Sequence, residues 1–172
     1  GILYNPMSIA LALHQLVEKE VYEAKDLFLA HGRWHSWMHH SDFSSSSQEE
    51  TLAKANFRFA KAKNKIAKAN WLMVTFGTAY VYIHKETQKV VGNCHKMPER
   101  MFTRSMLDVK TIVNEWQDVL KKCRAVNPNL KVLFTVSPIR HAKDGMHGNQ
   151  LSKATLLLAI DELCRMCPDC FY

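Results

Sequence analysis

The chain has 172 residues, of which 47% are hydrophobic and 23% are charged, so it is long enough for one domain with its own core. No apolar run approaches the roughly 20 residues of a transmembrane helix, so we expect no membrane span. The formal net charge of +7 is typical of nucleic-acid-binding proteins. Much of that charge lies on one predicted helix face without any basic–aromatic motif, so nucleic acid is not the partner that we predict.

The chain has five cysteines, an odd number at low density, which argues against a secreted disulfide scaffold. We therefore expect a reducing compartment and a cytoplasmic location. The first predicted helix begins at Asn5-Pro6, with asparagine as the cap and proline at the first helical position, and runs from about 7 to 19.

The segment 26–47 holds four histidines, two tryptophans and a serine run. It is long for a connection inside a domain, and its aromatic content predicts an ordered loop insertion that packs against the rest. Ser47 and Glu50 then form a capping box. Apolar residues recur every three or four positions after it, which predicts a helix that leads directly to Trp71.

The run Trp71–Phe76 is uninterrupted and apolar, which is typical of a strand buried on both faces. Gly77 ends this strand. Two β-rich runs around the polar tip Lys85–Gln88 predict a hairpin insertion over 78–92, which returns the chain to Asn93. Polar groups are thereby brought to the end of a central strand, where open α/β sheets bind ligands.

The segment Pro98–Met106 has no clear pattern and is predicted to be a loop. Asp108 is a candidate cap for the next helix, and the run Lys131–Val136 predicts a second buried strand. An apolar helix over 151–166 follows. Strands that alternate with helices predict a three-layer α/β domain, in which the two strands are adjacent and parallel, lie in the interior of the sheet and are covered by helices on both faces.

Several motifs together resemble one family. They are Gly1-Ile-Leu-Tyr-Asn-Pro6, Trp34-His-Ser36, His39-His-Ser41, Thr75-Phe-Gly-Thr-Ala-Tyr-Val-Tyr82, Val91-Gly-Asn-Cys-His-Lys96, Phe134-Thr-Val-Ser-Pro138 with Arg140-His141, and Lys143-Asp-Gly145 through Gly148-Asn-Gln-Leu-Ser-Lys-Ala154. In this order they resemble the GSCFA-domain family, which is similar to the SGNH (GDSL-type) ester hydrolases. The resemblance implies a flavodoxin-like (SGNH-type) three-layer sandwich with a mainly parallel sheet.

The family's Gly-Ser-Cys-Phe-Ala segment, whose serine corresponds to the SGNH nucleophile, has no counterpart here and would lie before Gly1. Its Asp-x-x-His-Pro-Ser element, which resembles the SGNH acid–base pair, would lie after Tyr172. We therefore expect residues 1–172 to form a single domain that is truncated at both ends, and expect this piece alone to be inactive.

The resemblance implies an ester hydrolase, which needs donors for the oxyanion of the reacting acyl group. Gly1 resembles the glycine whose N–H is one such donor, and Gly77 resembles the glycine of the Gly-x-Asn-Asp element. Ala79 stands where the asparagine of that element is expected, so we predict that Asn93 replaces it. The alternative is that Asn93 only fits a turn beside Gly92.

Two histidines, His95 and His141, follow the ends of the hairpin and the second strand and are candidate catalytic acids or bases. The candidate substrate-binding residues are His35, Ser36, His39, Asp144 and His147. Purely structural roles for these histidines are the alternative. The predicted partner is a small-molecule or glycan ester; the alternative function is a non-catalytic domain that binds glycans or polymers on the same fold.

Two spacings are compatible with a metal site. His35 and His39 stand at i, i+4, and Cys164, Cys167 and Cys170 repeat every three residues. Neither set has further ligands at partner spacing, and the cysteines fall at the end of an apolar helix where they suit packing. We therefore predict no metal and no cofactor.

Overall fold

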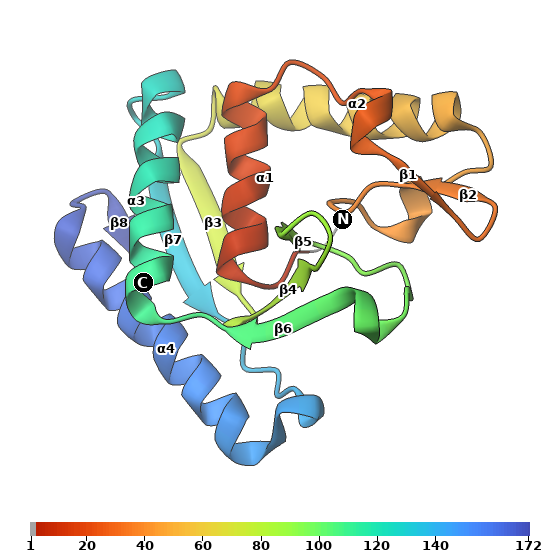
Figure 1. Cartoon of the computed structure of the whole chain (residues 1–172). Helices are drawn as coiled ribbons and strands as arrows, with labels where there is room; N and C mark the ends of the chain where they lie inside the picture. Colours follow the sequence, from red (N-terminus) through yellow and green to blue (C-terminus); the bar gives the residue numbers. More distant parts are fainter. Residues whose placement is uncertain (1–2) are drawn as a thin grey trace.

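The computed structural model of the chain describes residues 3–172 (Figure 1). The helices are α1 (Pro6–Glu18), α2 (Gln48–Ile66), α3 (Val109–Val126) and α4 (Gly145–Met166), with short 3₁₀ helices at Ala24–Asp26, Ser41–Phe43, Glu99–Met101 and Ala142–Asp144. The strands are β1 (Phe28–Ala30), β2 (Arg33–His35), β3 (Trp71–Phe76), β4 (Tyr80–His84), β5 (Lys89–Val91), β6 (Phe102–Met106), β7 (Lys131–Val136) and β8 (Cys170–Phe171).

Three helices begin where a polar side chain satisfies the free N–H groups of the first turn. The Asn5 side-chain oxygen accepts from the Ser8 N–H at 2.8 Å before α1, and Pro6 occupies the first helical position. The Ser47 hydroxyl accepts from the Glu50 N–H at 3.1 Å before α2. The Asp108 carboxylate accepts from the Thr111 N–H at 2.7 Å before α3. These three predicted helix starts are confirmed.

The central sheet has the order β3-β7-β8, and all of its pairings are parallel. The register joins Leu72 to Val132 and Phe76 to Val136, so the predicted adjacent, parallel pair of strands is confirmed. The chain reaches β7 from β3 through β4, β5, β6 and α3. The fold is therefore a mixed α/β domain around a small parallel sheet.

The prediction that both strands lie inside the sheet with both faces covered is wrong. β3 is an edge strand, and only alternate side chains are buried along it. Val74 and Phe76 face the core, whereas Met73 is 77% exposed on the opposite face and Thr75 is also exposed there. An apolar run shows that a strand suits burial, but it carries no information on whether a layer covers its second face.

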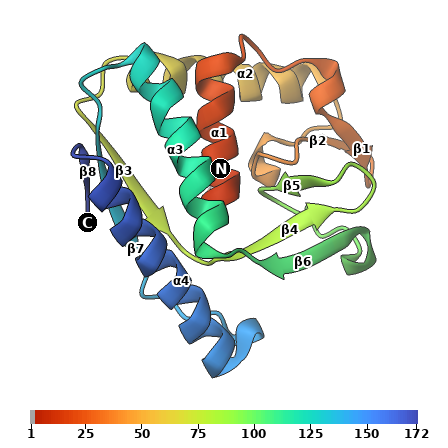
Figure 2. The same ribbon diagram turned by 60° about the vertical axis from the view of Figure 1, so that its left-hand side comes forward.

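The core lies between the covered face of the parallel sheet and the helices α1, α3 and α4 (Figures 1 and 2). Trp116 of α3 is completely buried at its centre, and its ring packs edge-on against Phe76 and Phe134 at 5.1 Å from each. The indole N–H donates to the Pro6 carbonyl at 3.2 Å. This bond satisfies the polar atom of a buried tryptophan and ties the start of α1 to α3.

A second, antiparallel sheet has the order β5-β4-β6 and lies beside the parallel one (Figure 2). β4 and β5 pair around the turn that follows His84. Residues 102–106, predicted to be part of a loop, instead form β6, which pairs with β4 from Tyr80↔Met106 to His84↔Phe102. The sequence FTRSM is short and mostly polar, so its strand character comes from this long-range pairing and not from its own pattern.

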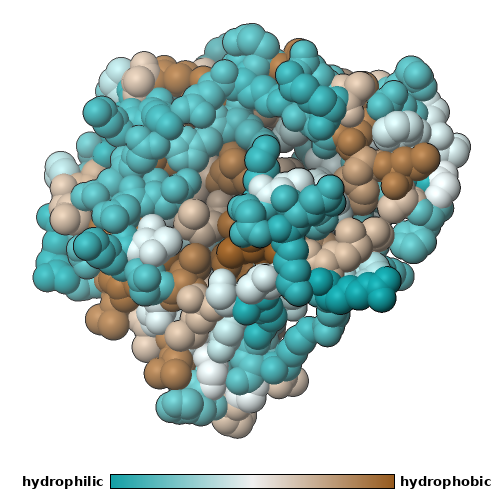
Figure 3. Space-filling view, viewed as in Figure 1, coloured by the Kyte–Doolittle hydropathy of each residue, from teal (hydrophilic) through white to brown (hydrophobic). Residues whose placement is uncertain are grey.

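The segment 26–47 is ordered and contains the β1–β2 hairpin. The Phe28 and Trp37 rings stack at 3.7 Å between centroids, so the aromatic residues pack the segment against itself. Hydrophilic residues cover much of the face seen in Figure 3, with apolar residues exposed near its centre. Within residues 3–172, no helix has the length and apolar character that crossing a bilayer requires.

Candidate functional site

A pocket of about 480 Å³ opens near the carboxyl ends of β3 and β7. Thr78 follows β3 and His141 follows β7, and both line the pocket. The antiparallel sheet supplies Tyr80 and Tyr82 from β4 and Arg104 from β6. The pocket therefore lies where the two sheets meet, at the sheet edge where α/β proteins bind ligands.

Asn93, His141 and Asp144 are the predicted site residues that line this pocket. Gly77 lies next to it, before Thr78. His147 is exposed and does not line it, and neither do His35, Ser36, His39 and His95. Gly1 lies outside the described residues.

The Asn93 side chain is held in one orientation from the hairpin return. Its carboxamide oxygen accepts from the His95 N–H at 2.8 Å, and its backbone N–H donates to the Trp37 carbonyl at 3.0 Å. Within residues 3–172, its side-chain NH₂ makes no hydrogen bond. The backbone and the amide oxygen thus fix the side chain, and the two amide protons remain free to donate to a ligand in the pocket.

Gly77 joins the end of β3 to the segment before α1. The Gly77 N–H donates to the Tyr4 carbonyl at 2.7 Å, and the Thr78 N–H donates to the same oxygen at 3.2 Å. A Cβ at position 77 would lie 3.1 Å from that oxygen, which explains why glycine suits this close approach. The Gly77 N–H would have to leave Tyr4 before it could bind an oxyanion.

Arg104 of β6 and Asp144 of the 3₁₀ helix Ala142–Asp144 form an ion pair at the wall of the pocket. The Asp144 side chain is 1% exposed, and the Arg104 guanidinium lies 3.8 Å from the centre of the Tyr80 ring. Among the described residues, the Asp144 Oδ2 and the Arg104 Nε have no hydrogen-bond partner. A second pair joins Lys143 to Glu99 at 2.5 Å, and that bond raises the pKa of Lys143.

These pairs compensate the strongest charges of the pocket. Arg104 is neutralised by Asp144, and Lys143 by Glu99. Burial raises the pKa of the Cys94 thiol, which keeps it protonated at neutral pH. The His141 backbone N–H donates to the Asn149 side-chain oxygen at 3.2 Å, and within residues 3–172 its imidazole forms no hydrogen bond. The pocket thus has neutral donors and acceptors, two tyrosine rings and two charge-compensated ion pairs in its lining.

His95 does not line the pocket. It is 6% exposed; its Nε2 lies 2.8 Å from the Ser36 carbonyl oxygen and its Nδ1 lies 3.4 Å from the Ser41 hydroxyl. Burial lowers its pKa, so the ring is neutral at physiological pH. Its ring therefore joins the hairpin return to the segment that follows β2.

Two further histidines of that segment are paired with serines. His35 is buried, and its Nδ1 lies 2.7 Å from the Ser44 hydroxyl. The Nδ1 of His39 lies 3.0 Å from the Ser36 hydroxyl, and burial is the main cause that lowers the pKa of His39 to about 4. Both serines are buried, so neither pair offers a hydroxyl to a substrate.

The C-terminal cysteines are engaged in packing and in contacts with Arg124. The Cys167 sulfur accepts from the Arg124 guanidinium at 2.7 Å, and the Cys170 sulfur lies 3.7 Å from the same group. Over residues 3–172, no three histidine, cysteine or acidic side chains are grouped as a metal ion would require.

Sequence reasoning missed the aromatic and charged wall of the pocket. Tyr80, Tyr82 and Lys143 belong to the motifs that resemble the family but were not predicted to be site residues. Arg104 lay in a segment that was predicted to be a loop. The segment 102–106 has no alternation of apolar and polar residues that could have placed Arg104 on a strand. No local pattern could have paired it with Asp144, which is 40 positions away.

One family model matches the chain that forms this pocket over its whole length. The model of the GSCFA family matches residues 1–172. The chain belongs to the GSCFA family. No curated protein and no solved structure matches the chain. In this GSCFA chain, the segments that follow β3, β5 and β7 come together at the pocket, where they contribute Thr78, Asn93 and His141.

Proposed function

We propose that this GSCFA chain is part of an SGNH-type ester hydrolase that acts on acyl or acetyl esters of a neutral, carbohydrate-like compound. The observation that carries the proposal is the free Asn93 amide in a pocket at the carboxyl ends of β3 and β7. A flavodoxin-like sandwich places its catalytic groups at that edge of the sheet. In this proposal, the serine nucleophile and its histidine base lie outside residues 1–172.

The substrate class follows from the charges of the pocket. Both strong cations in its wall have a carboxylate partner, so the pocket offers no uncompensated charge to an ionic substrate. The Tyr80 and Tyr82 rings, with the amide of Asn93, suit a neutral compound that has apolar faces and hydroxyl groups. An acylated sugar has both features.

The roles in the reaction follow from where each group stands. A serine oxygen would attack the acyl carbon while its proton passes to the base, and the carbonyl oxygen would become an oxyanion. The Asn93 NH₂ is the group that we assign to this oxyanion, because it donates without adding charge and is already oriented. His141, whose imidazole is free of protein partners among residues 3–172, is assigned to the leaving alcohol or to the sugar hydroxyls.

One observation favours the alternative, a domain that binds glycans without cleaving them. No serine is among the residues of the described chain that line the pocket, and the pKa of the Cys94 thiol is raised. The described lining of the pocket therefore contains no activated nucleophile.

The test compares the hydrolysis of short-chain aryl esters and acetylated sugars by three proteins: the 172-residue chain, a longer chain that includes the flanking segments, and the longer chain with Asn93→Ala. We expect turnover by the longer chain only. Asn93→Ala should lower kcat by about 100-fold with little change in KM, because an oxyanion bond forms mainly in the transition state. Asn64→Ala, on the exposed side of α2, is the matched control and should leave kcat unchanged.

Two results would contradict the proposal. Turnover by the 172-residue chain would show that the nucleophile lies inside it. An unchanged kcat in the Asn93→Ala variant would show that Asn93 only fits the turn beside Gly92 and does not bind the oxyanion. A longer chain that binds glycans but cleaves no ester would establish the alternative instead.

A further inference from the structure

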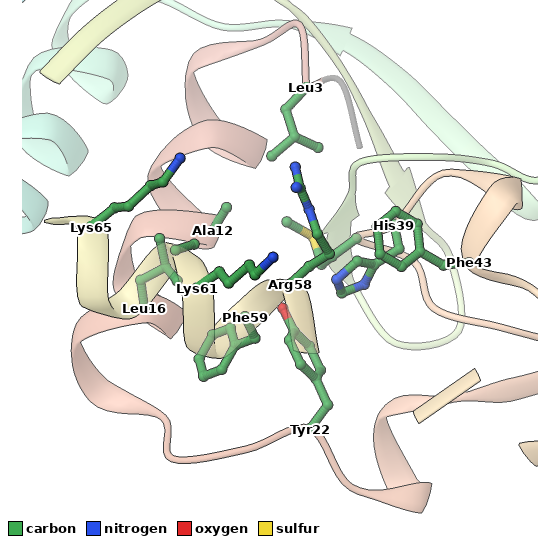
Figure 4. Close-up of a pocket in the computed structure, with 12 residues that line it drawn as sticks. Leu3, Ala12, Leu16, Tyr22, His39, Phe43, Arg58, Phe59, Lys61 and Lys65 are labelled. Carbon is green, nitrogen blue, oxygen red and sulfur yellow. The ribbon is translucent and has the colours of Figure 1, made fainter. Parts of the chain in front are cut away.

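A second pocket, of about 240 Å³, lies between α1, α2 and the segment that follows β2 (Figure 4). Helix α1 contributes Ala12 and Leu16, and α2 contributes Phe59 and Ala62. It shares no lining residue with the pocket near Asn93. Its volume is below the roughly 300–1,000 Å³ of sites for drug-sized ligands, so its occupant must be small.

The inner wall of this pocket is apolar and aromatic. Leu16 and Phe59 form one side, while Tyr22, His39 and Phe43 form another. Burial raises the pKa of Tyr22 to about 12, and burial lowers that of His39 to about 4, so both side chains are neutral at physiological pH. Their polar atoms are engaged: the Tyr22 hydroxyl donates to Gln15 at 2.6 Å, and the His39 Nδ1 lies 3.0 Å from the Ser36 hydroxyl.

The rim carries three cations from one face of α2. Arg58, Lys61 and Lys65 stand at i, i+3 and i+7 and extend along the same side of the pocket (Figure 4). Within residues 3–172, no carboxylate lies within 4.0 Å of any of them. Like charges at this spacing repel each other along a helix. The Lys61 ammonium lies 4.3 Å from the centre of the Phe57 ring, which is not a counter-anion. The rim is therefore a site of positive charge without a counter-anion in the described protein.

Other cations of the same helix are paired, which sets the rim apart. Lys54 bonds Glu50 at 2.6 Å, and Lys63 bonds Glu20 at 3.2 Å and the Lys19 carbonyl at 3.0 Å. Neither of these lysines lines the pocket. The cations of α2 without a carboxylate partner in the described chain thus include the three at the pocket.

We propose that this second pocket binds a small amphipathic carboxylate, with its apolar body against Leu16 and Phe59 and its carboxylate at Arg58 and Lys61. Only positive charge meets the ligand, because Tyr22 and His39 are neutral, so an anion is the complementary headgroup. The apolar wall selects against small hydrophilic anions. The proposal concerns binding alone and does not depend on the hydrolase activity proposed for the other pocket.

The test is a titration of the 172-residue chain with octanoate below its micelle-forming concentration. Calorimetry and NMR chemical shifts measure the binding. We expect saturable binding with a Kd of about 1 mM or below, and shifts at Leu16, Tyr22 and Ala62. The neutral analogue 1-octanol should bind at least about tenfold more weakly, since it forms no charged bond with the rim.

Two double variants separate a specific site from general attraction to a basic helix. Arg58→Gln with Lys61→Gln should weaken octanoate binding by about tenfold. Lys54→Gln with Lys63→Gln removes the same net charge from the same helix but leaves the rim intact, so it should change the Kd by less than about twofold. Far-UV circular dichroism and thermal unfolding check that both variants keep the fold.

Several outcomes would overturn the proposal. Equal affinity for octanoate and 1-octanol would show that the rim selects no anion. Equal loss of binding in both double variants would mean non-specific electrostatic attraction. If the protein sedimented with anionic lipid vesicles but did not bind octanoate, the basic rim would be a membrane-binding surface and not a pocket for a single molecule.

Discussion

Replacement of Asp144 by alanine should destabilise the protein much more than the loss of an ordinary surface ion pair. The Asp144 side chain is 1% exposed and that of Arg104 is 26% exposed, so the substitution leaves a largely desolvated guanidinium without its counter-charge. Breaking a fully buried pair costs about 3–5 kcal/mol. Because a quarter of Arg104 still reaches solvent, we expect a smaller loss of about 2–3 kcal/mol in the free energy of unfolding.

The measurements are urea-induced and thermal unfolding of the wild type, Asp144→Ala, Arg104→Met and the double variant. A domain of this size loses about 2–4 °C of Tm per kcal/mol, so Asp144→Ala should lower the Tm by about 5–10 °C. The double variant should be more stable than the sum of the two single losses predicts, because neither charge is left alone. The exposed pair Lys143–Glu99 supplies the control: Glu99→Ala should change the stability little.

The reasoning would be refuted by an Asp144→Ala variant within about 0.5 kcal/mol of the wild type, or by strictly additive losses in the double variant. Either result would mean that solvent reaches the pair freely. The Arg104 contact with the Tyr80 ring would then be the interaction that holds the arginine in place.

Three further outcomes follow from single contacts. Asn127→Ala should cost about 2–3 kcal/mol, because the buried Asn127 amide donates to the Ile66 and Ala69 carbonyls at 2.9 and 2.8 Å; urea unfolding measures the loss. His39 has a pKa of about 4 when folded, below the value near 6.5 of an unfolded histidine, so its burial should lower stability as the pH falls from about 6.5 to about 4. NMR titration of the ring and a shallower pH profile in His39→Gln check this. Gly77→Ala should cost about 1–2 kcal/mol in thermal unfolding, because a Cβ would press on the Tyr4 carbonyl at 3.1 Å, and a neutral effect would show that this segment yields freely.

The parts of the fold that the sequence predicted are those encoded by residues close to one another in the chain. Asn5, Ser47 and Asp108 cap helices within three positions of themselves, so their patterns were sufficient. The apolar runs of β3 and β7 also predicted a parallel pair, because a helix connects them and such crossovers favour parallel strands.

The parts that were missed depend on contacts between distant residues. Strand β6 exists because β4 lies beside it, and Met73 is exposed because no described layer covers that side of the sheet. Arg104 becomes part of the pocket only after β6 forms and brings it to Asp144. Among the predicted site residues, Asn93 and His141 reach the pocket because both follow the ends of strands, where position alone is informative.

The segment that follows β2 lies between the two pockets and contributes one histidine to each. His39 lines the second pocket and its neighbour His40 lines the first, so this short stretch separates them. The Trp37 carbonyl accepts from the N–H groups of Gly92 and Asn93 at 2.8 and 3.0 Å, which fixes the stretch to the hairpin return. Burial lowers the pKa of His39, so this histidine adds no charge to the second pocket at physiological pH. The charge of the second pocket therefore comes from α2, whereas in the first pocket Asp144 and Glu99 compensate Arg104 and Lys143.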